Sequence, residues 1–268
     1  MNLAKLFWAE VVREFTLLFR YPLETVSRLI WNLGFALLIF YGFEAVVGPG
    51  AGSLPGFEEG NRGRLLGLLT TYIAMNGLNN AAELLAEEVQ TGTLEQAALS
   101  PPPLTVVVLL RDLASFVEML ARFALVLFIA AFITGVTFHW DVPAIALLLT
   151  LMYLGTEGIG LALGGAALLY KRIATLSQFA IMLVFGLAMF PLEAVPGWAQ
   201  GFVHNFPFTK ALILLRDVAV KGVPLGDVAA SGELAALAVN TAVYLFLGIA
   251  VFAWSERKAR DWGTLNQY

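Results

Sequence analysis

The sequence predicts an all-α integral membrane protein with six transmembrane helices. Hydrophobic residues make up 59% of the 268 residues and charged residues only 13%, whereas about a quarter of the residues of a soluble domain are charged. Near-continuous apolar runs recur, and several approach the ~20 residues that a helix needs to cross the bilayer core. We therefore expect a single transmembrane domain over residues 1–268.

The composition also excludes several classes of site. The chain has no cysteine, and its two histidines, His139 and His204, lie far apart without metal-binding neighbours in sequence. The net charge of −4 provides no basic stripe that would neutralise nucleic-acid phosphates. We expect no catalytic, cofactor-binding or metal-binding residues on this chain, and no nucleic-acid partner.

The N-terminal segment, residues 1–22, is expected to form an amphipathic helix that lies in the membrane interface. Its apolar residues fall along one helical face, and its charged residues interrupt the run too often for a span. Trp8 would sit at headgroup depth. Tyr21-Pro22 would end the helix, because proline lacks a backbone donor and restricts the residue before it. The alternative is a packed amphipathic helix of a soluble layer.

Six apolar segments are long enough to be spans. We place them at about residues 29–47, 65–85, 116–136, 145–169, 173–192 and 234–254. The third is started at Phe116 because Arg111 and Asp112 interrupt the apolar run before it, and Glu118 and Arg122 are spaced to pair across one helical turn. Residues 193–222 form two shorter stretches broken by proline, which predicts an outer re-entrant or surface-lying element.

The distribution of basic residues predicts that both termini are cytoplasmic. Ten lysines and arginines outside the spans fall on the side of the termini and five on the opposite side, and cytoplasmic loops carry the excess. The short signals are Lys171-Arg172 and Arg257, Lys258 and Arg260. The chain is thus expected in the cell (plasma or inner) membrane.

Two sets of polar residues inside the spans are candidates for a translocation path. Asn76, Asn79, Asn80 and Glu83 fall at i, i+3, i+4 and i+7, on one helical face. Glu157 stands alone in a glycine-rich apolar run that contains a Gly160-x-x-x-Gly164 motif. Each set has a structural alternative, namely interhelical hydrogen bonds for the asparagines and a paired carboxyl for Glu157. We expect the glycines to serve helix packing.

The strongly polar loop over residues 87–103, EEVQTGTLEQAALSPPP, separates the second and third expected spans. Gly92 breaks it and three prolines close it, so a short rigid acidic element is expected. An acidic surface favours encounter with a basic groove on a soluble partner. The alternative is an ordinary solvated loop.

The loop carries a resemblance to the permease subunit of type-2 ATP-binding-cassette (ABC) exporters. The matching residues are an acidic pair, then Gly-Thr-Leu-Glu and finally Leu-Ser-Pro, and the expected order of helices is similar over nearly the whole chain. The resemblance implies a permease that pairs with a second copy, or a related permease, and with two copies of a separate ABC ATPase. It implies that the loop is a cytoplasmic coupling helix that docks on the ATPase; the coupling residues would be Glu87, Glu88, Gly92, Thr93, Leu94, Glu95, Ser100 and Pro101.

The same resemblance places an outer gate at Glu193 and Pro196, where the alternative is an interfacial carboxylate in water. The chain contains no GxxxxGK[ST] phosphate loop, so ATP and Mg²⁺ would bind the partner ATPase. Two other functions stay open: a proton-coupled secondary transporter that uses Glu157, and a membrane scaffold that recruits a soluble enzyme. The apolar spans favour an amphipathic or lipid-linked cargo.

Overall fold

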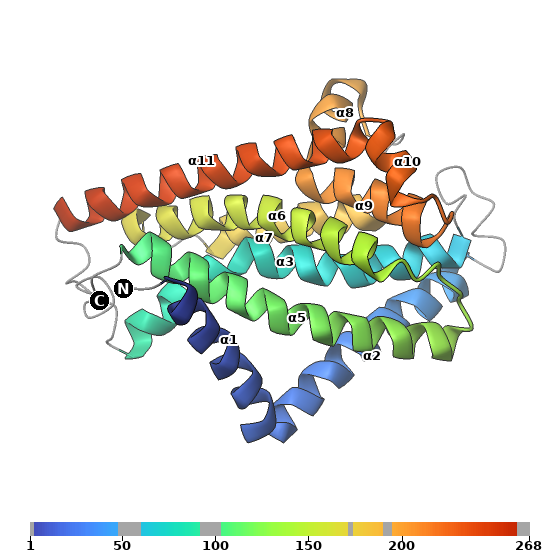
Figure 1. Ribbon diagram of the computed structural model, residues 1–268, viewed down its shortest axis with the longest axis horizontal. Helices are drawn as coiled ribbons and strands as arrows, with labels where there is room; N and C mark the ends of the chain where they lie inside the picture. The colour runs from blue at the N-terminus through green and yellow to red at the C-terminus, as the bar shows by residue number, and fades with distance from the viewer. Residues whose placement is uncertain (1–2, 48–59, 92–102, 171–173, 190–194, 262–268) are drawn as a thin grey trace.

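The computed structural model of the protein is a bundle of α-helices (Figure 1). It describes residues 3–47, 60–91, 103–170, 174–189 and 195–261, and these ranges contain no β-strand. The helices are α1 (Leu3–Arg20), α2 (Pro22–Val47), α3 (Gly60–Thr91), α5 (Leu104–Thr134), α6 (Val142–Tyr170), α7 (Ala174–Met189), α8 (Gly197–His204), α9 (Pro207–Ala219), α10 (Leu225–Ala230) and α11 (Glu233–Asp261).

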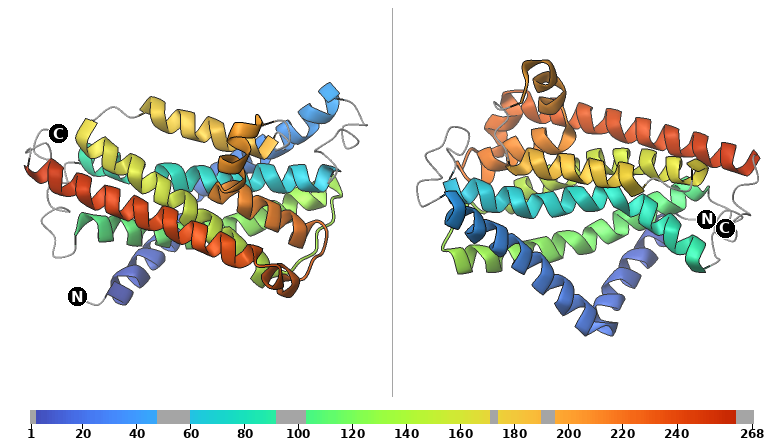
Figure 2. Two further views of the ribbon diagram at one scale, coloured as in Figure 1. Left: turned by 90° about the horizontal axis from the view of Figure 1, so that it is seen from above. Right: turned by 180° about the vertical axis from the view of Figure 1, so that it is seen from behind.

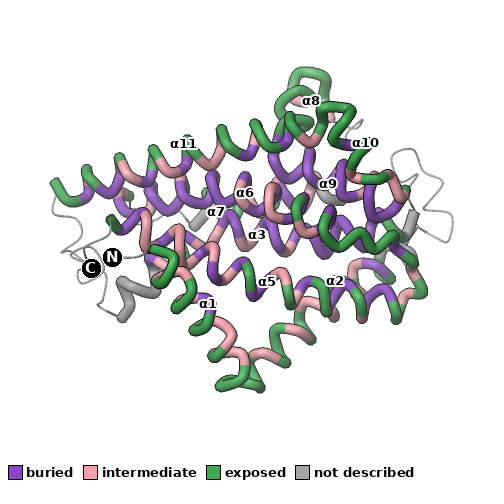
Figure 3. The backbone as a smooth tube through the Cα atoms, in the orientation of Figure 1, coloured by how far each residue is buried: buried purple, intermediate pink, exposed green. Residues whose placement is uncertain are grey.

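Helix α6 lies at the centre of the bundle, where α3, α11 and α9 pack against it. It is buried along most of its length, whereas α2 and α8 are largely exposed (Figure 3). Its glycines make this packing possible. Gly160 and Gly164 contact α3 at Gly77 and Ala81, and Gly158 lies against the α11 backbone near Tyr244 and Gly248. The glycines therefore serve helix packing, as the sequence predicted.

Within the described residues, four helices are long and apolar enough to cross a membrane, namely Pro22–Gly42 of α2 together with α5, α6 and α11. Helix α7 contains a shorter apolar stretch, Leu176–Leu187. Helix α3 is long enough, at 32 residues, but three asparagines in its middle lower its hydropathy. Its middle is nevertheless buried, with Leu65, Ile73 and Leu78 fully enclosed.

Helix α5 differs from the span expected at residues 116–136. It begins at Leu104 and runs without a break to Thr134, where Gly135 adopts the left-handed conformation (φ 69°) that ends it. The charged residues that seemed to interrupt the run are accommodated by the bundle. Arg111 lies 3.6 Å from Glu10 of α1, which packs against the first half of α5, and Asp112 is fully buried.

Helices α1 and α2 form a V beside the bundle (Figures 1 and 2). The corner is at Tyr21-Pro22, as the sequence predicted, and Phe19 and Leu23 beside it are exposed. At one end of the bundle α3, α6 and α11 end and α5 begins (Figure 1). The chain enters and leaves residues 92–102 at this end.

Candidate functional site

The two sides of the expected coupling loop are long helices. Helix α3 continues through Glu87 and Glu88 to Thr91, so these two residues are helical in backbone and not part of a loop that starts at Glu87. Gly92, Thr93, Leu94, Glu95, Ser100 and Pro101 lie outside the described residues. The chain is described again from Pro103, which takes an extended conformation (φ −53°, ψ 145°) before α5.

The first turn of α5 is bound by a carboxylate from α11. The backbone N–H groups of Leu104 and Thr105 each donate a 3.3 Å hydrogen bond to Glu256, and the Thr105 hydroxyl donates one of 2.7 Å. Arg260 holds the same carboxylate at 2.6 Å. A carboxylate at a helix N-terminus satisfies N–H groups that have no intrahelical partner and interacts favourably with the helix dipole. Helix α11 thus supplies the cap that the local sequence of α5 lacks.

The four polar residues of α3 do not share one environment. Asn76 donates a 2.8 Å hydrogen bond to the Tyr72 carbonyl of its own helix, Asn79 is half-buried, and Glu83 is exposed. Among these four, and within the described residues, only Asn80 is hydrogen-bonded to neighbouring helices. Its amide donates to Ser115 Oγ of α5 at 2.9 Å and to Tyr153 Oη of α6 at 3.3 Å. This geometry favours the interhelical role for Asn80.

The Asn80 network converges on one backbone carbonyl. Ser115 Oγ and Tyr153 Oη both donate to the carbonyl oxygen of Asp112, at 2.9 and 3.2 Å. Phe116 stacks on Tyr153 with a centroid distance of 4.2 Å. The three helices α3, α5 and α6 are therefore fixed to one another at this level of the bundle.

Glu157 lies next to Asp112, a residue that the sequence analysis did not select. Both side chains are completely buried and their carboxyl groups interact with each other. Within the described part of the chain, no N–H or hydroxyl group donates a hydrogen bond to any of the four carboxyl oxygens. Asp112 was missed because it follows Arg111 and seemed to belong to a polar break. The pair exists because α5 packs on α6 with Asp112 directed toward Glu157, which the sequence of one helix does not determine.

A buried ion pair lies further along α5. Arg122 pairs with Glu118, as the i, i+4 spacing predicted, and its Nη1 lies 3.4 Å from the Tyr72 hydroxyl of α3. Their side chains are only 11% and 6% exposed. The pair thus lies inside the bundle instead of at a solvated surface.

Of the two residues expected at an outer gate, Pro196 is the one that the structure describes. Pro196 is exposed and precedes α8, and Glu193 lies outside the described residues. The structure brings neither Pro196 nor Glu83 together with Glu157. The described part of the chain contains no cluster of three or more histidine or acidic residues that would hold a metal ion.

Comparison with known proteins adds a family assignment to this geometry. The family model described as ABC-2 type transporter matches residues 5–220. A comparison with curated proteins finds no match. The match covers most of the 268 residues, and the apolar helices agree with a multi-pass membrane protein that serves as a transport subunit. The chain belongs to the ABC-2 type transporter family and is an ABC transporter permease.

Proposed function

We propose that this permease is an exporter subunit that forms a translocation path as a dimer and is driven by a separate ATPase. The proposal rests on the family match together with the position of residues 92–102 between α3 and α5. Two copies of an ABC ATPase would bind ATP and Mg²⁺, since this chain carries no phosphate loop. Both termini and the coupling loop would face the cytoplasm.

The observation that carries the coupling proposal is the capping of α5 by Glu256. A push on the loop would reach α5 directly through Pro103 and would reach α11 through the Glu256 hydrogen bonds. It would reach α3 at Thr91, from which Asn80 connects to α5 and α6. Rigid helices joined in this way move as units, which suits the conversion of a local displacement into a change of the whole bundle.

A translocation path is proposed between two copies of the chain, at a face that a single copy leaves open. Helix α2 is barely buried and exposes Trp31, Phe35 and Leu38. An exposed apolar face of this kind meets lipid or another subunit. Among the predicted path residues, Asn76 and Asn79 are half-buried on α3, whereas Glu157 is enclosed and would need a helix movement to reach a path.

The test uses the permease reconstituted in proteoliposomes with a co-expressed ABC ATPase. The ATPase should co-purify with the permease and hydrolyse ATP faster in its presence. Glu88→Lys and Gly92→Pro should remove most of this stimulation while the permease stays folded. Asp227→Lys, an exposed charge reversal on α10, is the matched control and should leave stimulation intact. Unchanged stimulation in both loop variants would disprove the coupling role.

A second candidate function, proton-coupled transport by the chain alone, is favoured by the buried Asp112–Glu157 pair. Buried acid pairs in membrane proteins commonly carry protons. This function predicts uptake into liposomes driven by a pH gradient without any ATPase. The exporter proposal predicts no such uptake and full dependence on ATP.

A further inference from the structure

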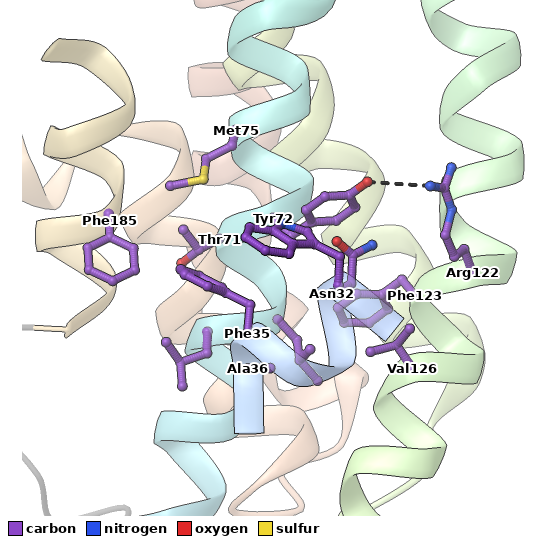
Figure 4. A pocket seen from close by; sticks show the side chains of 13 residues that line it. Asn32, Phe35, Ala36, Thr71, Tyr72, Met75, Arg122, Phe123, Val126 and Phe185 are labelled. Atoms are coloured by element: carbon purple, nitrogen blue, oxygen red, sulfur yellow. Dashed lines mark hydrogen bonds between the residues drawn. The ribbon is translucent and has the colours of Figure 1, made fainter. Parts of the chain in front are cut away.

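A cavity opens between α2, α3, α5 and α7 (Figure 4), and neither Asp112 nor Glu157 is among the residues that line it. Its volume is about 200 Å³. Most of the wall is apolar, formed by side chains such as Phe35, Leu68, Phe123 and Phe185. Leu68 and Phe123 are only 8% and 6% exposed, so the cavity reaches into the bundle and is not merely a depression of its surface.

The cavity has a polar end and an apolar end. Asn32, Tyr72 and Arg122 lie toward one end, where Arg122 Nη1 meets the Tyr72 hydroxyl (Figure 4). Met75 also lines this end, one helical turn beyond Tyr72 on α3. The apolar end is lined by Ala36, Leu68 and Val126. Each lies on the same helix as one of the three polar residues and about one helical turn away from it, toward the other end of the cavity. Beyond Arg122, α5 continues for 12 residues to its end at Thr134. About 18 Å of apolar helix therefore lies on the side of Arg122 toward the end of α5.

Arg122 keeps hydrogen-bonding capacity at the polar end. Its Nε and Nη2 bond Glu118 and its Nη1 reaches Tyr72, whereas a guanidinium has five N–H donors. The remaining donors would bind an oxygen-rich group such as a phosphate or carboxylate. Since Glu118 already balances the charge, recognition would depend on hydrogen bonds more than on net attraction.

We propose that this cavity binds one alkyl chain of an amphiphile whose phosphate lies at Arg122. The cavity opens beside Trp31, which is 71% exposed on the face of α2 that also borders the proposed path. An alkyl chain would therefore enter sideways between helices, from the bilayer or from that path. A helix of a second subunit is about 10–12 Å across and would not fit this volume. The site accepts a bilayer phospholipid and a phosphate-bearing amphiphilic substrate by the same chemistry.

The test uses a phosphatidylglycerol with a photoreactive diazirine in its acyl chain, added to the full-length permease in nanodiscs. After irradiation, peptides that contain Leu68 or Phe123 should carry the label, although surrounding lipid does not reach these buried side chains. Ala36→Phe and, independently, Val126→Phe fill the cavity and should reduce this labelling about tenfold. Leu38→Phe changes an exposed residue of the same helix and should leave it unchanged.

The polar end is tested by the double variant Glu118→Gln, Arg122→Gln, which removes both charges together. Labelling at Leu68 by the phosphate-bearing probe should fall about tenfold, while that by a diazirine fatty alcohol should not change. Equal loss for both probes would overturn the assignment of the phosphate to Arg122. Labelling confined to exposed residues, or unaffected by both filling variants, would overturn the site.

The source of the amphiphile follows from a further measurement on the permease with its ATPase. Labelling that persists during ATP hydrolysis identifies a resident bilayer phospholipid, and labelling that ATP hydrolysis removes identifies a transported amphiphile. Both results support the binding site. The binding test needs no ATPase, so its failure is distinct from failure of the proposed coupling.

Discussion

The hydroxyl of Thr105 donates a 2.7 Å hydrogen bond to Glu256, which lies 151 residues later in the chain. The bond joins the first turn of α5, immediately after the expected coupling loop, to the end of α11. Glu256 is only 5% exposed, so bulk water competes poorly for its carboxylate. This contact therefore connects the first turn of α5, directly after the expected coupling loop, to α11.

The capping contact predicts a graded series at Thr105. Thr105→Val removes the hydroxyl at similar volume and should lower the free energy of unfolding by about 1 kcal/mol, and it should weaken stimulation of the ATPase. Thr105→Ser retains the hydroxyl and should behave almost like the parent. Thermal melting in detergent and ATPase stimulation in liposomes measure the two effects. If Val and Ser variants stimulate equally, the contact does not contribute to coupling.

The Asp112–Glu157 pair predicts an unusual response to neutral substitutions. Glu157→Gln should keep or raise the melting temperature, because a neutral amide avoids a second buried charge and can donate a hydrogen bond to Asp112. Glu157→Ala should lower the melting temperature, and the free energy of unfolding by about 1–3 kcal/mol, because it leaves a cavity in a tightly packed core. A melting temperature that falls as far for Gln as for Ala would contradict this account.

The close packing of α6 on α11 predicts that Gly158 tolerates no side chain. A Cβ atom at Gly158 would overlap the backbone of Tyr244 and Leu245, so Gly158→Ala should destabilise the bundle by about 1–3 kcal/mol. The control is Gly186→Ala on α7, where a Cβ atom meets no atom of the described residues within 4 Å and alanine's helix propensity should give a gain of about 0.5–1 kcal/mol. Melting temperatures of the two variants should move in opposite directions.

Replacement of Glu14 of α1 by a neutral residue is predicted to raise stability in a pH-dependent way. Burial raises the pKa of the Glu14 carboxyl; Arg13 opposes this, and Glu118 and Glu10 add to it. Because the folded pKa exceeds the unfolded value, ionisation of Glu14 disfavours folding once the pH is above both pKa values, and this disadvantage vanishes below the unfolded pKa.

Glu14→Gln should therefore raise the melting temperature at neutral pH but not below about pH 4, near the unfolded pKa of glutamate. Glu24→Gln serves as control, since Glu24 forms an exposed ion pair with Arg28 and should give no gain at neutral pH. The same gain for Glu14→Gln at both pH values would mean that it does not arise from ionisation.

Much of the architecture could be predicted from local sequence patterns. Long apolar runs, the proline after Tyr21 and the prolines before α8 and at the start of α9 act over a few residues, so the helices and breaks could be placed from them. The Glu118–Arg122 pair was predictable because both residues belong to one helix. The start of α5 was not, because the burial of Asp112 and the pairing of Arg111 with Glu10 depend on helices elsewhere in the chain.

By itself, the sequence determined that this is a helical membrane protein and carried the loop motif that resembles its family. Only the tertiary structure decided that Asp112 faces Glu157, that Asn80 bonds Ser115 and Tyr153, and that Glu256 caps α5. The physical reason is the distance along the chain over which each kind of signal acts. Apolar periodicity and turn residues act within a helix, whereas these contacts depend on how each helix is rotated and how far it slides against its neighbours. That geometry is set by close packing around the glycines of α6.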